Sequence, residues 1–308
     1  MKFRTEIKPI VRDLKVSHQS KIMAIGSCFV ENIGGILKTQ GFDIDMNPFG
    51  ILFNPISILN ILNEEIDLTE KHLIDKGTHV VSLDFHSKYH HPSKEKFRQA
   101  YATDRVKLQN NLKNLDLLIL TFGTAWVYEY VESKKTIANC QKLNDRLFNK
   151  KLLDLNDLNS NYTQVLLKLL QGNPNLKILL TVSPVRHIKD GIIENSTSKA
   201  LLLMLCQHLK TSFPKQVIYY PSYELVMDDL RDYRFYEADL IHPNGQAIQY
   251  IYENFSDSFF SDKTKQLVLL KKKLNAMKAH VFLNASPAEI ALHHAKMDKL
   301  ALEIKNAV

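Results

Sequence analysis

Short apolar runs alternate with amphipathic segments along most of this chain, and this alternation constrains the fold more than any other feature. Three of the runs, residues 22–25, 116–120 (DLLIL) and 177–182 (KILLTV), have the length of buried strands. The apolar residues that follow Ser27 recur with helical spacing: Phe29, Val30, Ile33, Ile36 and Leu37. The pattern predicts βαβ units around a largely parallel sheet, which is an α/β fold.

Two further segments stand outside this alternation. Residues 127–131 and 136–139, joined by the polar run Glu132-Ser133-Lys134-Lys135, are typical of a hairpin inserted at the edge of the sheet. From about residue 262 the chain is rich in Lys, Leu and Ala, which predicts one or two long helices. We therefore expect an α/β domain over residues 1–261 and a helical extension over residues 262–308, either packed on that domain or used for association.

Charge and cysteine content narrow the class of protein. The 308 residues carry a formal net charge of +7, but without a stripe of interleaved aromatic and basic residues we expect a lysine-rich solvated surface and no nucleic-acid partner. The three cysteines, Cys28, Cys140 and Cys206, make neither a disulfide framework nor a zinc motif. Because no apolar stretch is long enough for a leader or a membrane span, we expect a soluble, cytoplasmic protein without a membrane partner.

Ser27 follows a predicted strand and a glycine, and a predicted helix starts directly after it. In an open parallel sheet, ligands bind at the carboxyl ends of the strands, and a helix N-terminus favours developing negative charge. The serine is therefore a candidate nucleophile, although capping the helix is a common role for serine at such a position. The neighbouring Cys28 is interpreted as a packing residue, because free cysteine is usually buried.

Asp239-Leu240-Ile241-His242 places an aspartate three residues before a histidine, in a loop that leads into a predicted helix. At this spacing the carboxylate can accept a hydrogen bond from one imidazole nitrogen and leave the other to act as a base toward a serine. The same residues also suit a helix cap. Together with an early serine at a strand end, the pattern favours a Ser-His-Asp site.

The order of these two motifs resembles the SGNH (GDSL-like) hydrolase superfamily. Within it, Gly26-Ser27-Cys28-Phe29-Val30 resembles the motif that names the GSCFA family, with valine in place of the final alanine. Other similar stretches are NPFGILFNP (47–55), TFGTAWVY (121–128), ANCQKL (138–143), TVSPVRH (181–187) and DYRFYEADLIHP (232–243). The resemblance runs from about residue 3 to about residue 260. It implies a three-layer α/β/α fold around a flavodoxin-like, parallel, five-stranded sheet.

The resemblance also implies roles for individual residues. Ser27 matches the nucleophile, His242 the base and Asp239 the acid that orients it. The oxyanion hole of the superfamily uses the N–H of the nucleophile, a glycine N–H after the second strand and an asparagine side chain after the third. Gly50 is the candidate glycine, and Asn47 in the same loop is a rival donor.

The third oxyanion donor departs from the pattern of the superfamily. Gly123-Thr124-Ala125-Trp126 stands where GxND is expected, so the asparagine is missing. The N–H of Gly123 or the hydroxyl of Thr124 is its candidate replacement. Loss of one oxyanion donor typically costs about 2.7–4 kcal/mol of transition-state stabilisation.

Two further segments supply candidate substrate-binding residues. Arg186 and His187 follow a predicted strand and suit a carboxylate, a phosphate or a sugar hydroxyl, while an ion pair that anchors the loop, with Asp190 or Glu194, is the alternative. His86 and His90 belong to the densest histidine cluster of the chain, HSKYHH. A metal site is a second interpretation of this cluster, but we expect a substrate-binding loop and neither a metal nor a cofactor.

These observations predict a serine hydrolase that removes short acyl groups from a small acylated substrate, with a carbohydrate favoured. An O-acyltransferase that uses the same Ser-His-Asp site is one alternative. A carbohydrate-binding or assembly module with a degenerate site is another, supported by the missing asparagine. Association through the C-terminal helices to form a homodimer is a further open alternative.

Overall fold

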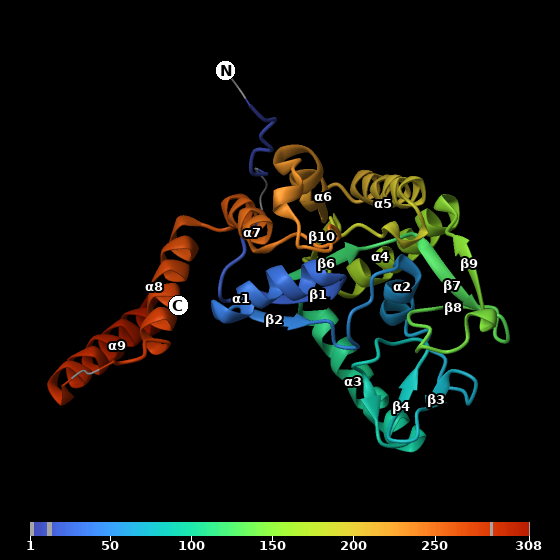
Figure 1. Cartoon of the computed structure of the whole chain (residues 1–308), viewed down its shortest axis with the longest axis horizontal. Helices are drawn as coiled ribbons and strands as arrows, with labels where there is room; N and C mark the ends of the chain where they lie inside the picture. Colours follow the sequence, from blue (N-terminus) through green and yellow to red (C-terminus); the bar gives the residue numbers. More distant parts are fainter. Residues whose placement is uncertain (1–2, 11–13, 284–285, 308) are drawn as a thin grey trace.

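The computed structural model describes residues 3–10, 14–283 and 286–307. A five-stranded parallel sheet in the order β11-β10-β6-β1-β2 lies at its centre (Figure 1). The strands are β1 (Lys21–Gly26), β2 (Asp43–Met46), β6 (Leu117–Phe122), β10 (Lys177–Val182) and β11 (Val217–Tyr219). This is the flavodoxin-like order, so the predicted fold class is confirmed.

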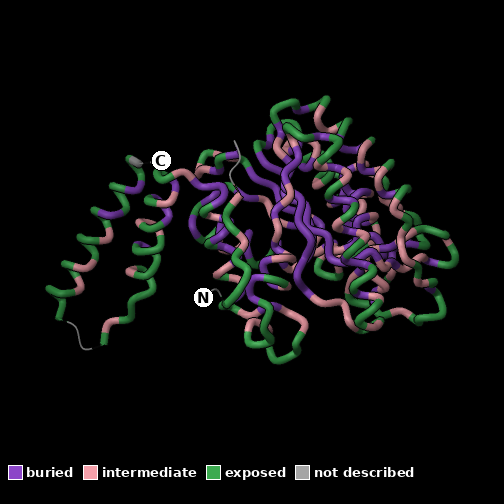
Figure 2. Tube along the Cα trace, turned by 90° about the horizontal axis from the view of Figure 1, so that it is seen from above, coloured by how far each residue is buried: buried purple, intermediate pink, exposed green. Residues whose placement is uncertain are grey.

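Helices cover both faces of this sheet, which is why its inner strands β1, β6 and β10 are largely apolar. Met23 and Ile25 of β1 face one hydrophobic cluster, whereas Ile22 and Ala24 face the other. The first layer consists of α2 (Pro55–Asn63), α3 (Lys94–Asn114), α4 (Leu155–Gly172) and α5 (Ile192–Ser212). The second consists of the π-helical η1 (Val30–Gly34), α1 (Gly35–Thr39), the π-helical η4 (Leu225–Leu230) and α7 (Gly245–Phe259). The short α6 (Ser222–Glu224) directly precedes η4, and its Tyr223 packs against the first cluster. In Figure 2 the buried chain forms a continuous band between the two layers.

The hairpin expected at the edge is a three-stranded antiparallel sheet in the order β8-β7-β9. Its strands are β7 (Trp126–Tyr130), β8 (Lys135–Ile137) and β9 (Phe148–Leu152), which the short 3-10 helix η2 (Asp145–Leu147) precedes. A second small sheet pairs β3 (Leu73–Asp75), β4 (Val80–Ser82) and β5 (His90–His91). Two 3-10 helices, η3 (Ile188–Asp190) and η5 (Tyr233–Phe235), lie in loops that follow β10 and η4.

The C-terminal helices α8 (Asp262–Lys278) and α9 (Pro287–Ala307) form a hairpin that projects from the α/β body (Figure 1). The two helices pack on each other through a separate cluster that includes Leu267, Leu274, Leu300 and Ile304. Contacts with the body are made by Val268, which belongs to the second layer's cluster, and by Asn275 Nδ2, which donates to the Thr39 carbonyl (2.9 Å). The division at residue 262 and the homodimer stay predictions. No helix in the described part of the chain is long and apolar enough to cross a membrane.

Gly26 ends β1 with a φ of +151° and approaches β6 closely. A β-carbon at this position would overlap the carbonyl oxygen of Thr121, the residue paired with Gly26 in the register of β1 and β6. Both the backbone conformation and the contact therefore require glycine. The turn that delivers Ser27 depends on this close approach.

We expect Gly26→Ala to lower the free energy of unfolding by at least about 2 kcal/mol, because backbone strain and steric overlap add. Gly35→Ala is the matched control, since a β-carbon on Gly35 would meet no atom within 4 Å. That change should be neutral or stabilise the helix by up to about 1 kcal/mol. Urea unfolding followed by circular dichroism measures both. Equal effects of the two substitutions would contradict the proposed strain at Gly26.

Candidate active site

Ser27 lies directly after β1 at the carboxyl edge of the sheet and is buried. Its Oγ accepts the N–H of Phe29 (3.4 Å), and its carbonyl accepts the N–H of Val30 (2.9 Å). Its own N–H donates to the carbonyl of Thr121 (3.3 Å). Ser27 thus caps the following helical segment, the alternative that its sequence context left open. The long Oγ contact leaves the hydroxyl only weakly held.

Cys28, the neighbour of Ser27, is partly exposed, and burial raises the pKa of its thiol. A raised pKa leaves less thiolate at neutral pH and so makes the thiol a poorer nucleophile. Cys28 is not among the residues of the hydrophobic clusters, so its packing role stays a prediction.

Asp239 and His242 form the pair that their spacing predicts. His242 Nδ1 lies 2.7 Å from Asp239 Oδ2, and Asp239 Oδ1 accepts the backbone N–H groups of His242 (3.0 Å) and Ile241 (2.8 Å). These hydrogen bonds lower the pKa of Asp239 to about 2. The bond from the backbone N–H of His242 contributes most, and the bond from the His242 ring comes second. Both side chains are nearly half exposed, and in the described residues His242 Nε2 has no hydrogen-bond partner. The aspartate is therefore ionised at neutral pH, and the second ring nitrogen is available.

Arg186, which follows the carboxyl end of β10, forms hydrogen bonds with the loop that contains Asp239 and His242. Its N–H donates to the carbonyl of Ile241 (3.1 Å), and its Nη1 donates to that of Leu240 (3.0 Å). The guanidinium also lies over the rings of Tyr233 and Tyr236. Predicted as a substrate-binding residue, Arg186 lies where it anchors the loop of the acid–histidine pair.

A small pocket connects this loop with the helix that follows Ser27. Its lining includes Phe29, Asn32, Ser183 and Pro243. Pro243 directly follows His242, and Phe29 lies two residues beyond Ser27. Phe29 and Pro243 thus line one pocket, and the described residues contain no hydrogen bond between Ser27 and His242.

Each predicted oxyanion donor already has a partner within the chain. The N–H of Gly50 donates to the Asn47 carbonyl (2.8 Å), and the N–H of Gly123 donates to the Phe53 carbonyl (2.7 Å). The Thr124 hydroxyl lies 3.0 Å from Ser198 Oγ. The bond from the Ser27 N–H to Thr121, at 3.3 Å, is the longest of the four. Of these donors, Ser27 N–H is the one most easily redirected to a ligand.

Asn47, the rival donor, joins the ends of β1 and β2 through its side chain. Its Oδ1 accepts the N–H of Gly26 (2.9 Å), and its Nδ2 donates to Glu31 (2.7 Å). His86 packs against Gly50, where a β-carbon would lie 2.5 Å from that of the histidine. Burial and Lys88 lower the pKa of His86. Asn47, Gly50 and His86 therefore share one loop region near the serine turn.

His187 lies between the histidine loop and the end of β6. Its Nε2 is 3.3 Å from the point where a β-carbon of Gly123 would be, and its ring is 5.8 Å from that of Phe53. Burial, followed by the charge of Lys199, lowers its pKa to about 4, with His242 contributing in the same direction. His187 is therefore neutral at pH 7 and has one ring donor and one ring acceptor.

Lys199, in α5, is a site residue that sequence reasoning missed. It is fully buried, and its Nζ donates to the carbonyls of Gly123 (2.6 Å) and Ser183 (2.7 Å). These carbonyls belong to the residues that follow β6 and β10, so the lysine ties together two adjacent loops of the edge. Helical periodicity gave a signal, because Lys199 shares a buried stripe with Leu202, Cys206 and Leu209.

Burial lowers the pKa of Lys199 to about 7, against 10.5 as its ordinary value. Between these values the unfolded chain binds one more proton, so raising the pH favours the folded state. We expect the free energy of unfolding of the wild type to rise between pH 7 and pH 9, relative to Lys199→Met, by up to about 1.4 kcal/mol per pH unit. Urea unfolding at several pH values measures this difference. The exposed Lys168 in α4 gives the control variant Lys168→Met, which should follow the wild type. Parallel curves for wild type and Lys199→Met would contradict the assignment.

A pocket of about 260 Å³ opens beside His187, and its lining includes Thr124, Trp126, Tyr128, Lys150 and Asp190. Asp190 forms an ion pair with Lys150, so the alternative in which Asp190 pairs with the Arg186–His187 segment is not what the structure shows. His90 lies in β5 of the second small sheet, and its ring packs 4.9 Å from that of His79. The described residues thus bring His187 to a pocket and place His90 in a separate sheet.

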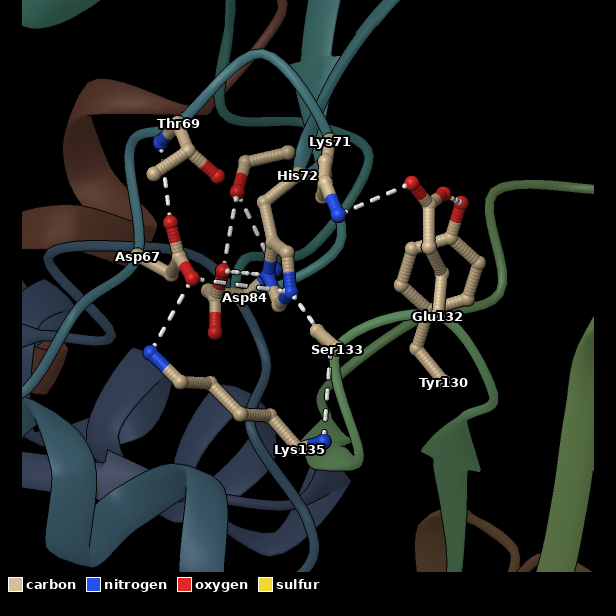
Figure 3. Close-up of polar contacts among 10 residues, drawn as sticks. Asp67, Thr69, Lys71, His72, Asp84, Tyr130, Glu132, Ser133 and Lys135 are labelled. Atoms are coloured by element: carbon tan, nitrogen blue, oxygen red, sulfur yellow. Dashed lines mark hydrogen bonds and ion pairs between the residues drawn. The ribbon is translucent and has the colours of Figure 1, made fainter.

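A second serine–histidine–aspartate arrangement, also missed from the sequence, lies where the two small sheets meet. His72 Nδ1 is 2.6 Å from Asp84 Oδ2, and His72 Nε2 is 2.9 Å from Ser133 Oγ (Figure 3). His72 and Asp84 are buried, whereas Ser133 is partly exposed in the turn between β7 and β8. The Ser133 Oγ also accepts the N–H of Lys135 (3.3 Å). We interpret these hydrogen bonds as a structural link between the two small sheets. Ser133 is therefore a suitable control residue in tests of Ser27.

In the described ranges, no group of three or more His, Cys, Asp or Glu side chains is placed to hold a metal ion.

The fold and this edge define an α/β protein of flavodoxin-like topology with a buried serine directly after β1 and an Asp–His pair in a loop bonded to Arg186. The chain belongs to the GSCFA family, whose model matches residues 21–255. No curated protein matches it significantly.

The chain is similar in structure to a Bacteroides fragilis protein provisionally described as an acylhydrolase, with a TM-score of 0.41, 10% identity, and 80% of this chain and 88% of that chain covered. It is also similar to a catalytic mutant of Axe2, an acetylxylan esterase from Geobacillus stearothermophilus, with a TM-score of 0.40, 11% identity, and coverage of 80% and 98%. A carbohydrate esterase of family 3 from Talaromyces cellulolyticus has a TM-score of 0.34, 10% identity, and coverage of 83% and 99%.

Proposed function

We propose that this protein is a serine hydrolase of SGNH type that removes short acyl groups from a carbohydrate or a related small substrate. The observation that carries the proposal is the Asp239–His242 hydrogen bond of 2.7 Å. It fixes one ring nitrogen and leaves Nε2 available as a base, and Pro243 of the same loop lines a pocket together with Phe29, two residues after Ser27.

The reaction would proceed through an acyl-enzyme. Ser27 Oγ attacks the ester carbonyl while His242 Nε2 takes the hydroxyl proton, and Asp239 stabilises the imidazolium that forms. The tetrahedral intermediate collapses by breaking its bond to the alcohol oxygen, which receives the proton from His242. Water then attacks the acyl-serine, again with His242 as base, and releases the acid and the free serine.

The developing oxyanion would be held by redirected backbone donors. Ser27 N–H comes first, because its present bond to Thr121 is the longest, and Gly50, Gly123 and Thr124 are the other candidates. A missing donor costs about 2.7–4 kcal/mol, a factor of about 10²–10³ in kcat. We therefore expect turnover well below that of an enzyme with the complete GxND motif.

Hydrolysis of p-nitrophenyl acetate and labelling by a fluorophosphonate test the proposal. We expect the folded wild type to take up one probe per chain and to release p-nitrophenol with a burst when deacylation is slow. If release depends on an added sugar or alcohol, the same acyl-enzyme serves an acyltransferase. A folded wild type that is neither labelled nor active on several short esters would refute the proposal that this protein is a serine hydrolase.

A non-catalytic carbohydrate-binding module is the second candidate. It is favoured by one specific observation, namely that the N–H groups of Gly50 and Gly123 and the hydroxyl of Thr124 are all hydrogen bonded within the chain. Sugar binding without labelling would support it.

A further inference from the structure

The pocket beside His187 lies between the β8-β7-β9 sheet and the loop that follows β10. Trp126 and Tyr128 alternate along β7, so their side chains lie on the same face of the strand, and both are partly exposed. Trp126 Nε1 donates to the carbonyl of Glu194 (3.1 Å), which fixes the orientation of the indole. The pocket therefore has a rigid aromatic wall.

Two charged side chains, Lys150 of β9 and Asp190 of η3, line the pocket beside the two aromatic rings. Lys150 is opposite Tyr128 in the register of β7 and β9, and its Nζ lies 5.4 Å from the Tyr128 ring centroid and 5.7 Å from that of Trp126. The ammonium forms an ion pair with Asp190 of η3, and both side chains retain about a quarter of their exposure. A cationic donor and an anionic acceptor thus lie side by side at an aromatic surface. This combination suits neighbouring hydroxyl groups on a ring whose C–H face packs on an aromatic side chain.

Thr124 and His187 are the candidate site residues that line this pocket. The imidazole lines the pocket and packs against Gly123, and His242 is close enough to lower its pKa. Because His187 is neutral at pH 7, it offers a donor and an acceptor to a hydroxyl, and no charge for an anion. The volume of about 260 Å³ is slightly below the range of about 300–1,000 Å³ for drug-sized ligands, which suits a small, single-ring ligand.

We propose that this pocket is a sugar-binding subsite that holds one pyranose ring of an acylated carbohydrate, with the ring on Trp126 and Tyr128 and its hydroxyls on Lys150, Asp190 and His187. The placement of the acyl group toward Ser27 rests on the proposed function, whereas the binding of the ring does not.

Trp126 is the only tryptophan of the chain, so its fluorescence reports on this pocket alone. We expect methyl glucoside and methyl xyloside, added to the full-length wild type, to change the emission with saturation. Sorbitol, which has the hydroxyls of a hexose but no ring, should give no saturating change. Lys150→Met should weaken sugar binding at least about fivefold by removing a charged hydrogen bond. The control is Lys151→Met, since Lys151 points to the opposite face of β9 and pairs with Glu129.

The absence of a saturating response to both glycosides would overturn the proposal, as would an equal response to sorbitol or equal weakening by the two lysine variants. Fluorophosphonate labelling separates this outcome from failure of the proposed function. Labelling without sugar binding would indicate a hydrolase that acts on other esters. Sugar binding without labelling would indicate the non-catalytic carbohydrate-binding module.

Discussion

Ser27→Ala is expected to abolish fluorophosphonate labelling and to reduce ester hydrolysis by at least about 10³-fold. The reason is that the proposed acyl-enzyme needs the Ser27 oxygen, and the remaining groups can only bind and polarise the ester. The change removes a single weak side-chain hydrogen bond to Phe29 N–H, at 3.4 Å, so the fold should survive. Turnover of p-nitrophenyl acetate and mass spectrometry of the labelled chain measure the effect.

Ser133→Ala is the matched control for this experiment. Ser133 Oγ lies 2.9 Å from a histidine that is itself bonded to an aspartate, so it is the serine most able to imitate an activated nucleophile. We expect normal labelling and normal turnover in this variant. Loss of labelling in Ser133→Ala, with labelling retained in Ser27→Ala, would move the reaction centre to the turn between β7 and β8.

Asp239→Asn is expected to lower kcat/KM by about 10²–10⁴-fold. An asparagine can still accept the backbone N–H groups of Ile241 and His242, but its amide group can face the ring and then favours the wrong imidazole tautomer. Since the pKa of Asp239 is about 2, its charge is constant above about pH 4. A loss of activity between pH 7 and pH 4 would therefore come from another group. Rates measured across this range in both proteins check the assignment.

Asp232→Asn is the control for the aspartate. Asp232 is exposed and accepts the N–H of Arg234 (2.8 Å), so it occupies a similar cap in the same region without contacting His242. It should retain wild-type activity. If both asparagine variants kept full activity, Asp239 would be only a cap of its loop.

The central sheet could be predicted because its inner strands are buried on both faces and are therefore largely apolar runs. β10 coincides with the predicted run 177–182, and β6 (Leu117–Phe122) overlaps the predicted run 116–120 but begins one residue later and ends two residues later. β9 (FNKKL) was missed because it is an edge strand with three consecutive polar residues, Asn149, Lys150 and Lys151, between Phe148 and Leu152. β3 and β5 have three and two residues, too few to show a period.

The candidate site was only partly predictable, for a related reason. Asp239 and His242 are local in sequence, so their spacing predicted their hydrogen bond. Lys199 and the carbonyls of Gly123 and Ser183 are brought together by the sheet, and no local pattern encodes that meeting. The pairing of His72 with Ser133 likewise joins two small sheets that are distant in sequence.

The hairpin of α8 and α9 has its own hydrophobic cluster, which gives it a stability partly independent of the sheet. The contacts that join the hairpin to the body come from α8, among them those of Lys271 with Gly41 and of Asn275 with Thr39, whereas Leu292 and Leu302 of α9 are exposed. Units of this kind can unfold locally while the rest of the protein stays folded. Amide protons in α9 should therefore exchange with solvent well before those in β6 and β10, and limited proteolysis should cut the hairpin while the α/β body stays intact.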